Sequence, residues 1–383
     1  MNTLLSEKQR TVRRSVRSFC DRELAPIAGA IDQESRFPWE VVEMMGKLGY
    51  FGVQAPKELG GADLDSLSYA VTIEEISRAS GAMGLTVTVH NSVAVYPILH
   101  FGTDTQKRRW IPSLARGEKI GAFCLTEPNA GSDAAALEAT ALRKDTFYLV
   151  NANKVFVSNG AVADVCLIFA RTDPAAGRKG ISIIVAERGT PGFVVGDLED
   201  LSGMRANPVC SLRFYDCPVP LENLLGKEGT GLHIALATLD TGRMGIAAQA
   251  LGIAQAALEA SARYARQRRQ FGVPIGNHQA VQIMLADMAT TVDAARLLVY
   301  RTAILRDTGS PFSREAAMAK LFASEASGTV TDKAVQIHGG YGYSKTYAVE
   351  RYYRDARVTR IYEGTSEIHR MVIARRVLDE YAP

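Results

Sequence analysis

The sequence is poor in the residues that build disulfide frameworks and metal centres. Its 383 residues include five cysteines and six histidines. The cysteines are scattered and never spaced as Cys-x-x-Cys, and the histidines form neither a close pair nor a His-Glu-x-x-His motif. A disulfide-stabilised secreted domain and a metal site are therefore not expected, and a reducing compartment fits better.

The sequence also lacks an excess of one charge and a long apolar run. The 44 Lys and Arg residues against 41 Asp and Glu residues leave a net charge of +3, which is too mild to indicate a nucleic-acid partner. No run of about 18 uncharged apolar residues is apparent, so no membrane span is expected. The basic residues between Lys8 and Arg17 could pass for a mitochondrial transit peptide, but the acidic residues that follow favour an ordinary first helix.

The composition is typical of a large globular protein, with 47% hydrophobic and 22% charged residues. Residues 1–120 show helical periodicity broken by Pro and Gly residues. Residues 121–231 contain short β-prone runs with no helix-length segment between them, which predicts an antiparallel sheet. Residues 232–383 return to long helical patterns, including one over 233–268, and predict a bundle.

Two segments could bind the phosphate groups of a ligand. Residues 124–133, Cys-Leu-Thr-Glu-Pro-Asn-Ala-Gly-Ser-Asp, offer hydroxyl groups and a glycine that allows close backbone approach. An ordinary turn has the same composition. Residues 266–272, Arg-Gln-Arg-Arg-Gln-Phe-Gly, could clamp a pyrophosphate. Arginines also simply suit the C-terminal end of a helix.

Three further features lie in the C-terminal third. Residues 336–343, Gln-Ile-His-Gly-Gly-Tyr-Gly-Tyr, have more glycines than a helix end requires. Glu363 stands just before a helix that Thr365 or Ser366 can cap. It could be a helix-dipole partner, or a general base if it is shielded from water. Asp240 and Arg243 form either a surface ion pair or a buried pair that meets a polar ligand.

In this order and spacing, the five segments resemble the acyl-CoA dehydrogenase family over nearly the whole chain. Segments 239–255 and 352–370 are most similar to its short-chain (butyryl) members. The resemblance implies a mainly α protein with a β-domain. The expected parts are an N-terminal helical domain (1–120), a middle antiparallel β-barrel or sandwich domain (121–231) and a C-terminal four-helix bundle (232–383). It also implies FAD at the junction of β-domain and bundle, and a homotetramer built as a dimer of dimers.

Matched positions assign the site residues that the resemblance implies. Glu363 matches the catalytic base. The substrate contacts are Ser132, Asp240, Arg243, Tyr362 and Gly364. The cofactor contacts are Phe123, Leu125, Thr126, Gly131, Ser132, Phe156, Val157, Ser158, Arg268, Phe271, Gln279, Gln336, Gly339, Gly340, Thr365 and Glu367, of which Arg268, Phe271 and Gln279 match residues that reach the FAD of a neighbouring subunit. Phe156 and Ser158 replace the commoner Trp and Thr, and Thr346 replaces a usual acidic residue.

The reaction implied is FAD-dependent α,β-dehydrogenation of an acyl-CoA to the trans-2-enoyl-CoA, as in fatty acid β-oxidation. Glu363 would remove the Cα proton while a hydride passes to flavin N5, and an electron-transferring flavoprotein would take the electrons. The nearby helix N-terminus opposes a rise in the carboxyl pKa. We therefore expect the pKa of Glu363 to rise only modestly until substrate excludes water.

The sequence also bears on the acyl group, the electron acceptor and the compartment. Residues 80–99 should set the depth of the acyl pocket, with Met83, His90 and Tyr96 as candidates to shape it. No arginine lies between Ala79 and Phe101, which favours short, branched or cyclic monocarboxylic acyl groups over dicarboxylic ones. The alternatives are an acyl-CoA or nitroalkane-type flavin oxidase on the same fold, or a non-enzymatic scaffold. The expected location is the bacterial cytoplasm, or the mitochondrial matrix in a eukaryote.

Overall fold

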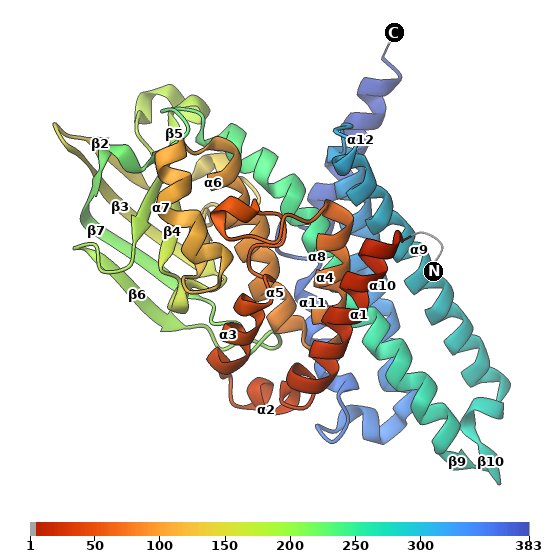
Figure 1. The fold of residues 1–383 in the computed structure, drawn as a ribbon. Coiled ribbons are helices and arrows are strands. Elements are labelled where there is room, and N and C mark those ends of the chain that lie inside the picture. Colours follow the sequence, from red (N-terminus) through yellow and green to blue (C-terminus); the bar gives the residue numbers. More distant parts are fainter. Residues whose placement is uncertain (1–4, 383) are drawn as a thin grey trace.

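The computed structural model describes residues 5–382. A layer of short helices lies between a β-sheet on one side and long helices on the other (Figure 1). The N-terminal helices are α1 (Glu7–Phe19), π-helix η2 (Cys20–Leu24), α2 (Ala28–Gln33), α3 (Trp39–Lys47), α4 (Ser66–Ala79), α5 (Gly81–Val89), π-helix η4 (His90–Val95), α6 (Tyr96–Phe101) and α7 (Asp104–Ala115).

Helices α5, η4 and α6 form one continuous helical stretch, Gly81–Phe101. Its mean hydropathy of 1.2 and its 21 residues would allow it to cross a membrane, which the sequence reading did not anticipate. However, 89% of its most apolar window is buried inside the protein. This stretch is therefore a core helix, and its π-helical centre departs from regular geometry as π segments near functional sites often do.

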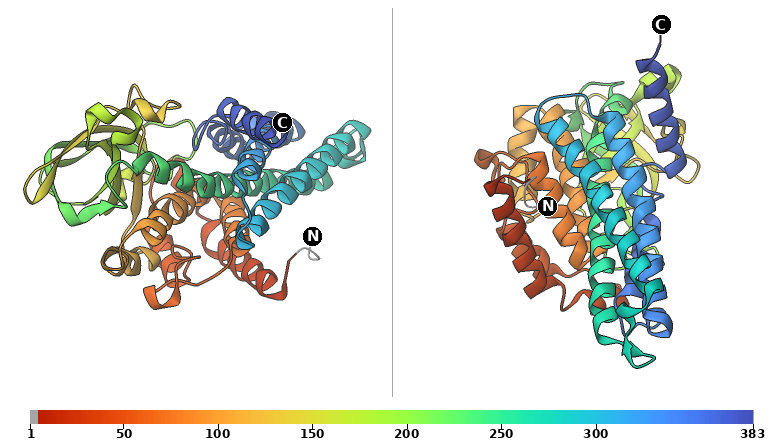
Figure 2. Two further views of the ribbon diagram at one scale, coloured as in Figure 1. Left: turned by 90° about the horizontal axis from the view of Figure 1, so that it is seen from above. Right: turned by 90° about the vertical axis from the view of Figure 1, so that its right-hand side faces the viewer.

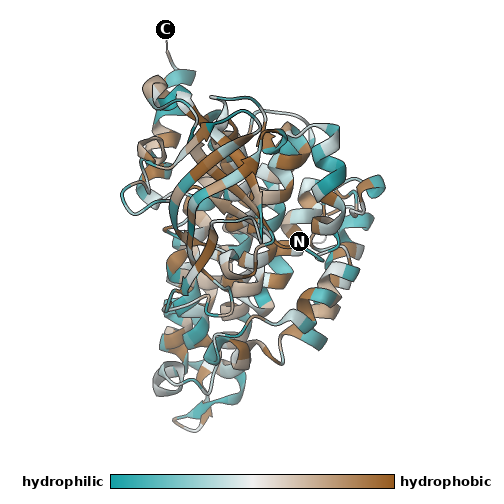
Figure 3. Cartoon of the chain, turned by 90° about the vertical axis from the view of Figure 1, so that its left-hand side faces the viewer, coloured by the Kyte–Doolittle hydropathy of each residue, from teal (hydrophilic) through white to brown (hydrophobic). Residues whose placement is uncertain are grey.

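The middle region forms one eight-stranded sheet. Along the sheet the strands run β6–β7–β3–β2–β4–β5–β8, with β1 paired to β4. The strands are β1 (Gly121–Cys124), β2 (Thr140–Arg143), β3 (Phe147–Val157), β4 (Val165–Arg171), β5 (Ile181–Glu187), β6 (Phe193–Leu198), β7 (Cys210–Pro220) and β8 (Leu224–Leu225). Strands β4 and β5 are buried almost throughout, and hydrophobic residues gather in the sheet while the peripheral loops are hydrophilic (Figure 3).

The sheet differs from the expected all-antiparallel arrangement at two pairings. Strand β1 pairs with β4 in parallel, and β2 meets β4 in parallel at a single position. The other pairings are antiparallel. The prediction assumed that parallel strands need a helical crossover. Here the connection from β1 to β4 runs through the β2–β3 hairpin instead.

The C-terminal region contains three long helices, α8 (Gly231–Gln267), α9 (Gln279–Asp307) and α10 (Ser313–His338), followed by α11 (Val349–Val358) and α12 (Ser366–Glu380). Helix α8 packs against α10, α9 and α4, and α12 packs along α10. The long helices run side by side away from the sheet (Figure 2). A short hairpin, β9 (Arg269–Gln270) and β10 (Val273–Pro274), joins α8 to α9 at their far end, and the turn η10 (Gly339–Tyr343) follows α10.

Short 3-10 turns complete the chain: η3 (Lys57–Leu59), η5 (Ala134–Ala136), η6 (Gly160–Val162), η7 (Pro174–Gly180), η8 (Leu221–Asn223) and η9 (Ile275–Asn277).

Buried side-chain amides connect the sheet region to the N-terminal helices. Asn207 donates to the side-chain oxygens of Asn159 (2.7 Å) and Thr86 (2.8 Å). Satisfied polar groups of this kind fix the relative position of packed layers. These hydrogen bonds therefore connect the β-sheet region to helix α5.

Candidate active site

A cavity of about 230 Å³ lies where the sheet, helix α8 and the N-terminal core helix meet. Residues from all three parts of the chain line it: Val89, Val93, Phe123, Leu125, Thr126, Gly131, Ser132, Ala134, Phe156, Ser158, Leu236, Leu239, Arg243, Tyr362, Glu363, Gly364 and Ile368. The lining is mainly apolar with a few polar groups, as is typical of small-molecule sites. It contains Glu363 and ten of the other residues that the resemblance assigned.

Glu363 enters this cavity from a strained turn. Its φ is +54°, and the following Gly364 has φ +95°. A left-handed conformation costs a non-glycine residue about 1–2 kcal/mol, so the surrounding structure must hold Glu363 in place. The two left-handed residues turn the chain between α11 and α12 and direct the carboxylate of Glu363 into the cavity.

Three hydrogen bonds hold the turn. The Tyr362 hydroxyl donates to Gln249 on α8 at 2.8 Å. The ammonium of Lys320 on α10 donates to the carbonyl oxygen of Gly364 at 2.5 Å. The turn closes with Ser366 N–H donating to Arg360 O at 3.1 Å. The loop is thus fixed to two long helices, which gives the carboxylate a defined position.

Helix α8 leaves room for that carboxylate at Gly242. A Cβ atom at this position would lie 2.5 Å from Glu363 Oε2 and 2.9 Å from its Cδ. Contacts this short do not occur between packed atoms. Only glycine therefore lets α8 pass the carboxylate without moving it.

Burial makes Glu363 a weaker acid than an exposed glutamate. It raises the pKa of Glu363 from 4.5 to about 7, although the charges of Arg243 and Lys320 oppose the rise. Oε2 is buried without a hydrogen-bond partner. The expectation of only a modest shift before substrate binds is therefore wrong. Thr365 supplies the helix cap by accepting from Ile368 N–H, while burial dominates at the carboxylate.

Arg243 and Asp240 form the ion pair that their spacing suggested. Arg243 Nη1 donates to Asp240 Oδ1 at 2.6 Å, and the Arg243 side chain is 8% exposed. Its Nε is buried and unpartnered. Arg243 lines the cavity, whereas Asp240 does not line it and serves as the ion-pair partner of Arg243. The cavity thus presents an unpartnered acceptor on Glu363 and an unpartnered donor on Arg243.

The sheet side of the cavity is built on a bulge and a buried salt bridge. Strand β3 changes register between Lys154 and Val157, and Phe156 takes φ +53° with 62% of its surface exposed. Lys154 is fully buried and donates to Glu127 (2.7 Å) and to the carbonyls of Leu125 and Phe169. This network braces the 124–133 loop, which contributes Thr126 and Ser132.

Some assigned residues lie beside the cavity rather than in it. Val157 is buried in the sheet core, Thr365 is the cap of α12, and Glu367 is exposed on its first turn.

A second group lies at the far end of the bundle, near the β9–β10 hairpin: Arg268, Phe271, Gln279, Gln336, Gly339 and Gly340. These residues are exposed, Phe271 by 93%. The stretch of α8 from Arg243 to Gln267 is roughly 36 Å long at about 1.5 Å per residue. One cofactor bound beside Glu363 cannot reach both groups of a single chain.

Several side chains that line or support the cavity were not expected from the sequence, and others that were expected to shape it lie elsewhere. Val89 and Val93 line the cavity, whereas Met83 is buried away from it and His90 bonds Leu114 O and Gly121 N–H. Tyr96 packs against the His100 ring. Lys320 and Gly242 were not identified, because a lysine and a glycine within a helix carry no signal of what they contact. Their roles follow only from the packing of α8 and α10 around Glu363.

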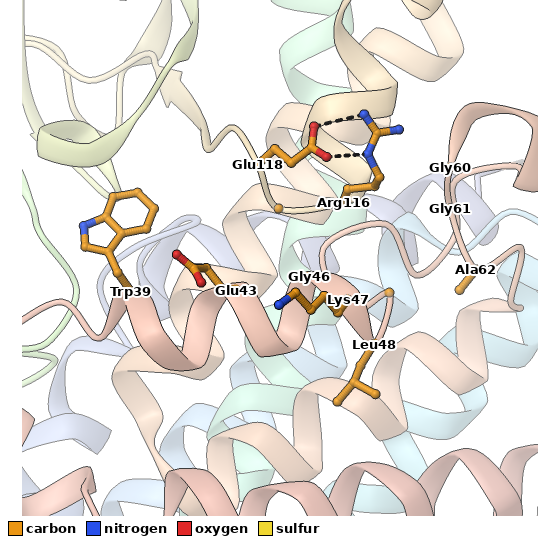
Figure 4. A pocket seen from close by; sticks show the side chains of 12 residues that line it. Trp39, Glu43, Gly46, Lys47, Leu48, Gly60, Gly61, Ala62, Arg116 and Glu118 are labelled. Atoms are coloured by element: carbon orange, nitrogen blue, oxygen red, sulfur yellow. Dashed lines mark hydrogen bonds and ion pairs between the residues drawn. The ribbon is translucent and has the colours of Figure 1, made fainter.

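A larger hollow of about 800 Å³ lies elsewhere, between α3 and the loops at residues 60–62 and 116–118. Figure 4 shows Arg116 and Glu118 paired with one another at its rim. It contains none of the candidate residues. The smaller cavity is therefore the candidate site, since it holds the buried carboxylate.

Comparison with known proteins agrees with this geometry. The chain matches the acyl-CoA dehydrogenase N-terminal domain over residues 6–118, the middle domain over 122–217 and the C-terminal domain over 229–378. It is 47% identical to the mitochondrial short-chain specific acyl-CoA dehydrogenase of Mus musculus, over 98% of this chain and 92% of that protein.

Two solved structures share the fold closely. Butyryl-CoA dehydrogenase from Megasphaera elsdenii has a TM-score of 0.96 and 42% identity, covering 98% of this chain and 99% of that one. A chain from a structure of the electron transferring flavoprotein of Acidaminococcus fermentans has a TM-score of 0.97 and 46% identity, covering 98% of both chains. The chain therefore belongs to the acyl-CoA dehydrogenase family of FAD-dependent oxidoreductases.

Proposed function

We propose that the chain oxidises a short monocarboxylic acyl-CoA to its trans-2-enoyl-CoA, with Glu363 as the base that removes the Cα proton. The observation that carries this proposal is Oε2 of Glu363, a carboxylate oxygen that is buried without a hydrogen-bond partner, on a residue that lines a cavity of about 230 Å³. A buried acceptor without a partner is costly in a folded protein. Its presence is explained if a ligand supplies the missing partner.

The acidity of Glu363 suits the reaction. A pKa of about 7 leaves the carboxylate substantially deprotonated at neutral pH and makes it a stronger base than an exposed glutamate. The fixed turn and Gly242 place it in one position, so little ordering is required when substrate binds. Val89, Val93 and Ile368 exclude water from the reacting carbons.

The residues around the cavity fit a flavin. Phe156 holds an exposed ring in a strained backbone conformation, and Thr126 and Ser132 add hydroxyl groups beside it. These residues, with Phe123, Leu125, Gly131 and Ser158, would hold the flavin portion of FAD. When bound, FAD supplies the acceptor for the hydride that leaves Cβ.

The cavity supports a short acyl group. The walls come from the buried stretch Gly81–Phe101 and from α8, and they have little freedom to widen. Arg243 is the cation of the lining and already pairs with Asp240, which supports an acyl group without a second carboxylate.

We also propose a homotetramer and an electron-transferring flavoprotein as electron acceptor. The far-end residues, from Arg268 to Gly340, are too distant to share a cofactor with Glu363 of the same chain, which supports a second subunit. Large apolar side chains on α9 and α12 are exposed, among them Ile283, Leu297, Met371 and Leu378. Exposed apolar side chains on these two helices support a subunit interface there. Five free, buried cysteines support the bacterial cytoplasm or the mitochondrial matrix as the compartment.

The proposal is tested by the visible spectrum of the purified protein and anaerobic titration with acyl-CoAs. Butyryl-CoA should bleach the bound flavin, and glutaryl-CoA should not. Isobutyryl-CoA and isovaleryl-CoA distinguish straight from branched preference. Rapid oxygen consumption during turnover in air would indicate an oxidase instead. A flavin that no acyl-CoA reduces would contradict the proposed reaction.

A further inference from the structure

Lys320 is buried directly beneath the turn that carries Glu363. It lies on α10, its side chain is fully buried, and its Nζ donates to Gly364 O at 2.5 Å. Among the described residues, no carboxylate oxygen lies within the 4.0 Å of an ion pair with Nζ. An ammonium group that is buried with one hydrogen bond and no carboxylate partner lowers the stability of the fold, so its presence requires another explanation.

Lys154 shows what a purely structural buried lysine looks like in the same chain. It is also fully buried, but its ammonium group has a carboxylate at 2.7 Å and two carbonyl oxygens. Lys154 is therefore fully satisfied by the protein. Lys320 donates one hydrogen bond to the turn, and the charge of Glu363 acts on it.

The charged and titratable groups around Glu363 come from every element packed against it. Helix α8 contributes the Arg243–Asp240 pair, and α10 contributes Lys320 and, further off, Glu325. Helix α12 contributes the buried His369, whose pKa burial lowers to about 3, and the exposed Glu367. Tyr362 precedes Glu363, and Tyr69 on α4 is close enough to sense its charge. Two cations, Arg243 and Lys320, therefore face Glu363, and Lys320 lacks a carboxylate partner of its own.

We infer that Lys320 is a positioning residue for the base: its hydrogen bond holds the left-handed Glu363–Gly364 turn, and its charge favours the carboxylate form of Glu363. This inference rests on the role proposed for Glu363. The bond to Gly364 O fixes the peptide that follows the base, so it limits how far the carboxylate can turn. The charge matters because burial alone would leave Glu363 protonated at neutral pH.

The titration behaviour of the two groups agrees with this arrangement. Burial lowers the pKa of Lys320 to about 7, although the charge of Glu363 opposes the fall. Burial raises the pKa of Glu363 to about 7, against Arg243 and Lys320. Each group thus supports the charged form of the other.

Two variants separate the bond from the charge. Lys320→Met removes both, and Lys320→Gln keeps an N–H donor but removes the charge. The protonated carboxyl band of Glu363 is followed against pH by infrared difference spectroscopy of the holoenzyme, with Glu363→Gln identifying the band. The pH profile of kcat/KM for butyryl-CoA is measured in parallel. Lys154→Met is the matched control, because it removes the other fully buried lysine.

Loss of the charge should raise the midpoint of the Glu363 band by about one pH unit in both variants, since a nearby opposite charge lowers a carboxyl pKa by about 1–3 units. The acidic limb of kcat/KM should move with it, so that the rate at pH 6 falls about tenfold. Lys154→Met should lower the unfolding midpoint and leave the Glu363 midpoint unchanged.

An unchanged Glu363 midpoint in the Lys320 variants would overturn the inference, even if their rates fall. If Lys320→Met does not fold, Lys320→Gln gives the same test of the charge. The infrared midpoint is read without turnover. A wild-type enzyme that no acyl-CoA reduces would contradict the proposed function, while the infrared measurement still decides whether Lys320 controls Glu363.

Discussion

Two clusters of buried charged side chains lie in the helical part of the molecule, and they differ in how completely their polar atoms are paired. In the paired cluster, Glu74 and Glu75 on α4 are bound by arginines from α1, α9 and α4 itself and by one tyrosine: Arg13, Arg17, Arg78, Arg296 and Tyr300. In the open cluster, Glu363 Oε2, Arg243 Nε and both ring nitrogens of His369 have no partner.

The difference separates a structural role from a functional one. The paired cluster links α1, α4 and α9, and each glutamate in it forms an ion pair with an arginine. The open cluster keeps donors and acceptors unpaired beside a cavity, which lowers stability. Paired buried charge therefore joins the helices, whereas the unpaired groups around Glu363 are the ones that the proposed reaction would use.

The largest expected effect of breaking the paired cluster is on stability. Glu74→Gln removes the buried carboxylate partner of Arg296, which keeps only the exposed Asp293. The loss of one partner from a buried ion pair costs about 3–5 kcal/mol. Unfolding by urea should show this loss. Glu7→Gln, which removes an exposed partner of Arg10 and Arg14, should change the unfolding free energy by less than about 1 kcal/mol. Equal losses in the two variants would contradict the distinction.

The open cluster should make stability fall as pH rises. The pKa of Glu363 is raised from 4.5 to about 7 in the folded protein. The folded state therefore binds more protons than the unfolded state between these values, and its advantage is complete below about pH 4.5 and lost by about pH 7. At about 1.4 kcal/mol per unit the total is about 3 kcal/mol. The difference in unfolding free energy between wild type and Glu363→Gln measures it, and a difference that does not vary with pH would contradict the raised pKa.

A methyl group added beside Glu363 should slow the reduction of the flavin but leave the FAD bound. In Gly242→Ala the new Cβ would stand 2.5 Å from Glu363 Oε2, so the carboxylate must move. A displacement of about 1 Å can reduce the rate about 100-fold. Stopped-flow reduction by butyryl-CoA measures the rate, and the flavin content of the purified variant is the control. A variant that is reduced at the wild-type rate would show that the position of the carboxylate is not limiting.

The smallest expected effect concerns the cavity wall. Val93→Ala removes two methyl groups from the lining, at about 0.8 kcal/mol for each methylene equivalent. The ratio of kcat/KM for hexanoyl-CoA to that for butyryl-CoA should rise about fourfold to tenfold. Val87→Ala is the matched control, since Val87 is fully buried in α5 but does not line the cavity. A similar rise in the control would assign the effect to general loosening.

Features of the fold and of the site that depend on neighbouring residues could be predicted from the sequence. The β-rich region predicted over residues 121–231 contains strands β1 to β8, and Thr365, one of the two residues expected to cap the last helix, caps α12. Glu363 could be identified because its neighbours Tyr362 and Gly364 belong to a recognisable segment. These features depend on residues close together in the chain.

The rest depends on contacts between distant segments. The parallel pairing of β1 with β4 is a choice between strands about 40 residues apart, which alternation within each strand does not specify. Lys320 has the spacing of an ordinary helical residue, and its burial follows from the packing of α10 beneath the Glu363 turn. The rise in the pKa of Glu363 likewise depends on that packing, and reasoning from the adjacent helix N-terminus gave too small a shift.

The most direct test of the central claim is the anaerobic reduction of the bound flavin by butyryl-CoA in wild type and Glu363→Gln. The wild type should be bleached rapidly. The variant should retain its flavin and a wild-type or higher unfolding midpoint, and its reduction should be slower by at least about 10²–10⁴-fold, the usual contribution of a positioned base. Reduction of the variant at the wild-type rate would contradict the assignment of Glu363 and, with it, the functional meaning of the unpaired cluster.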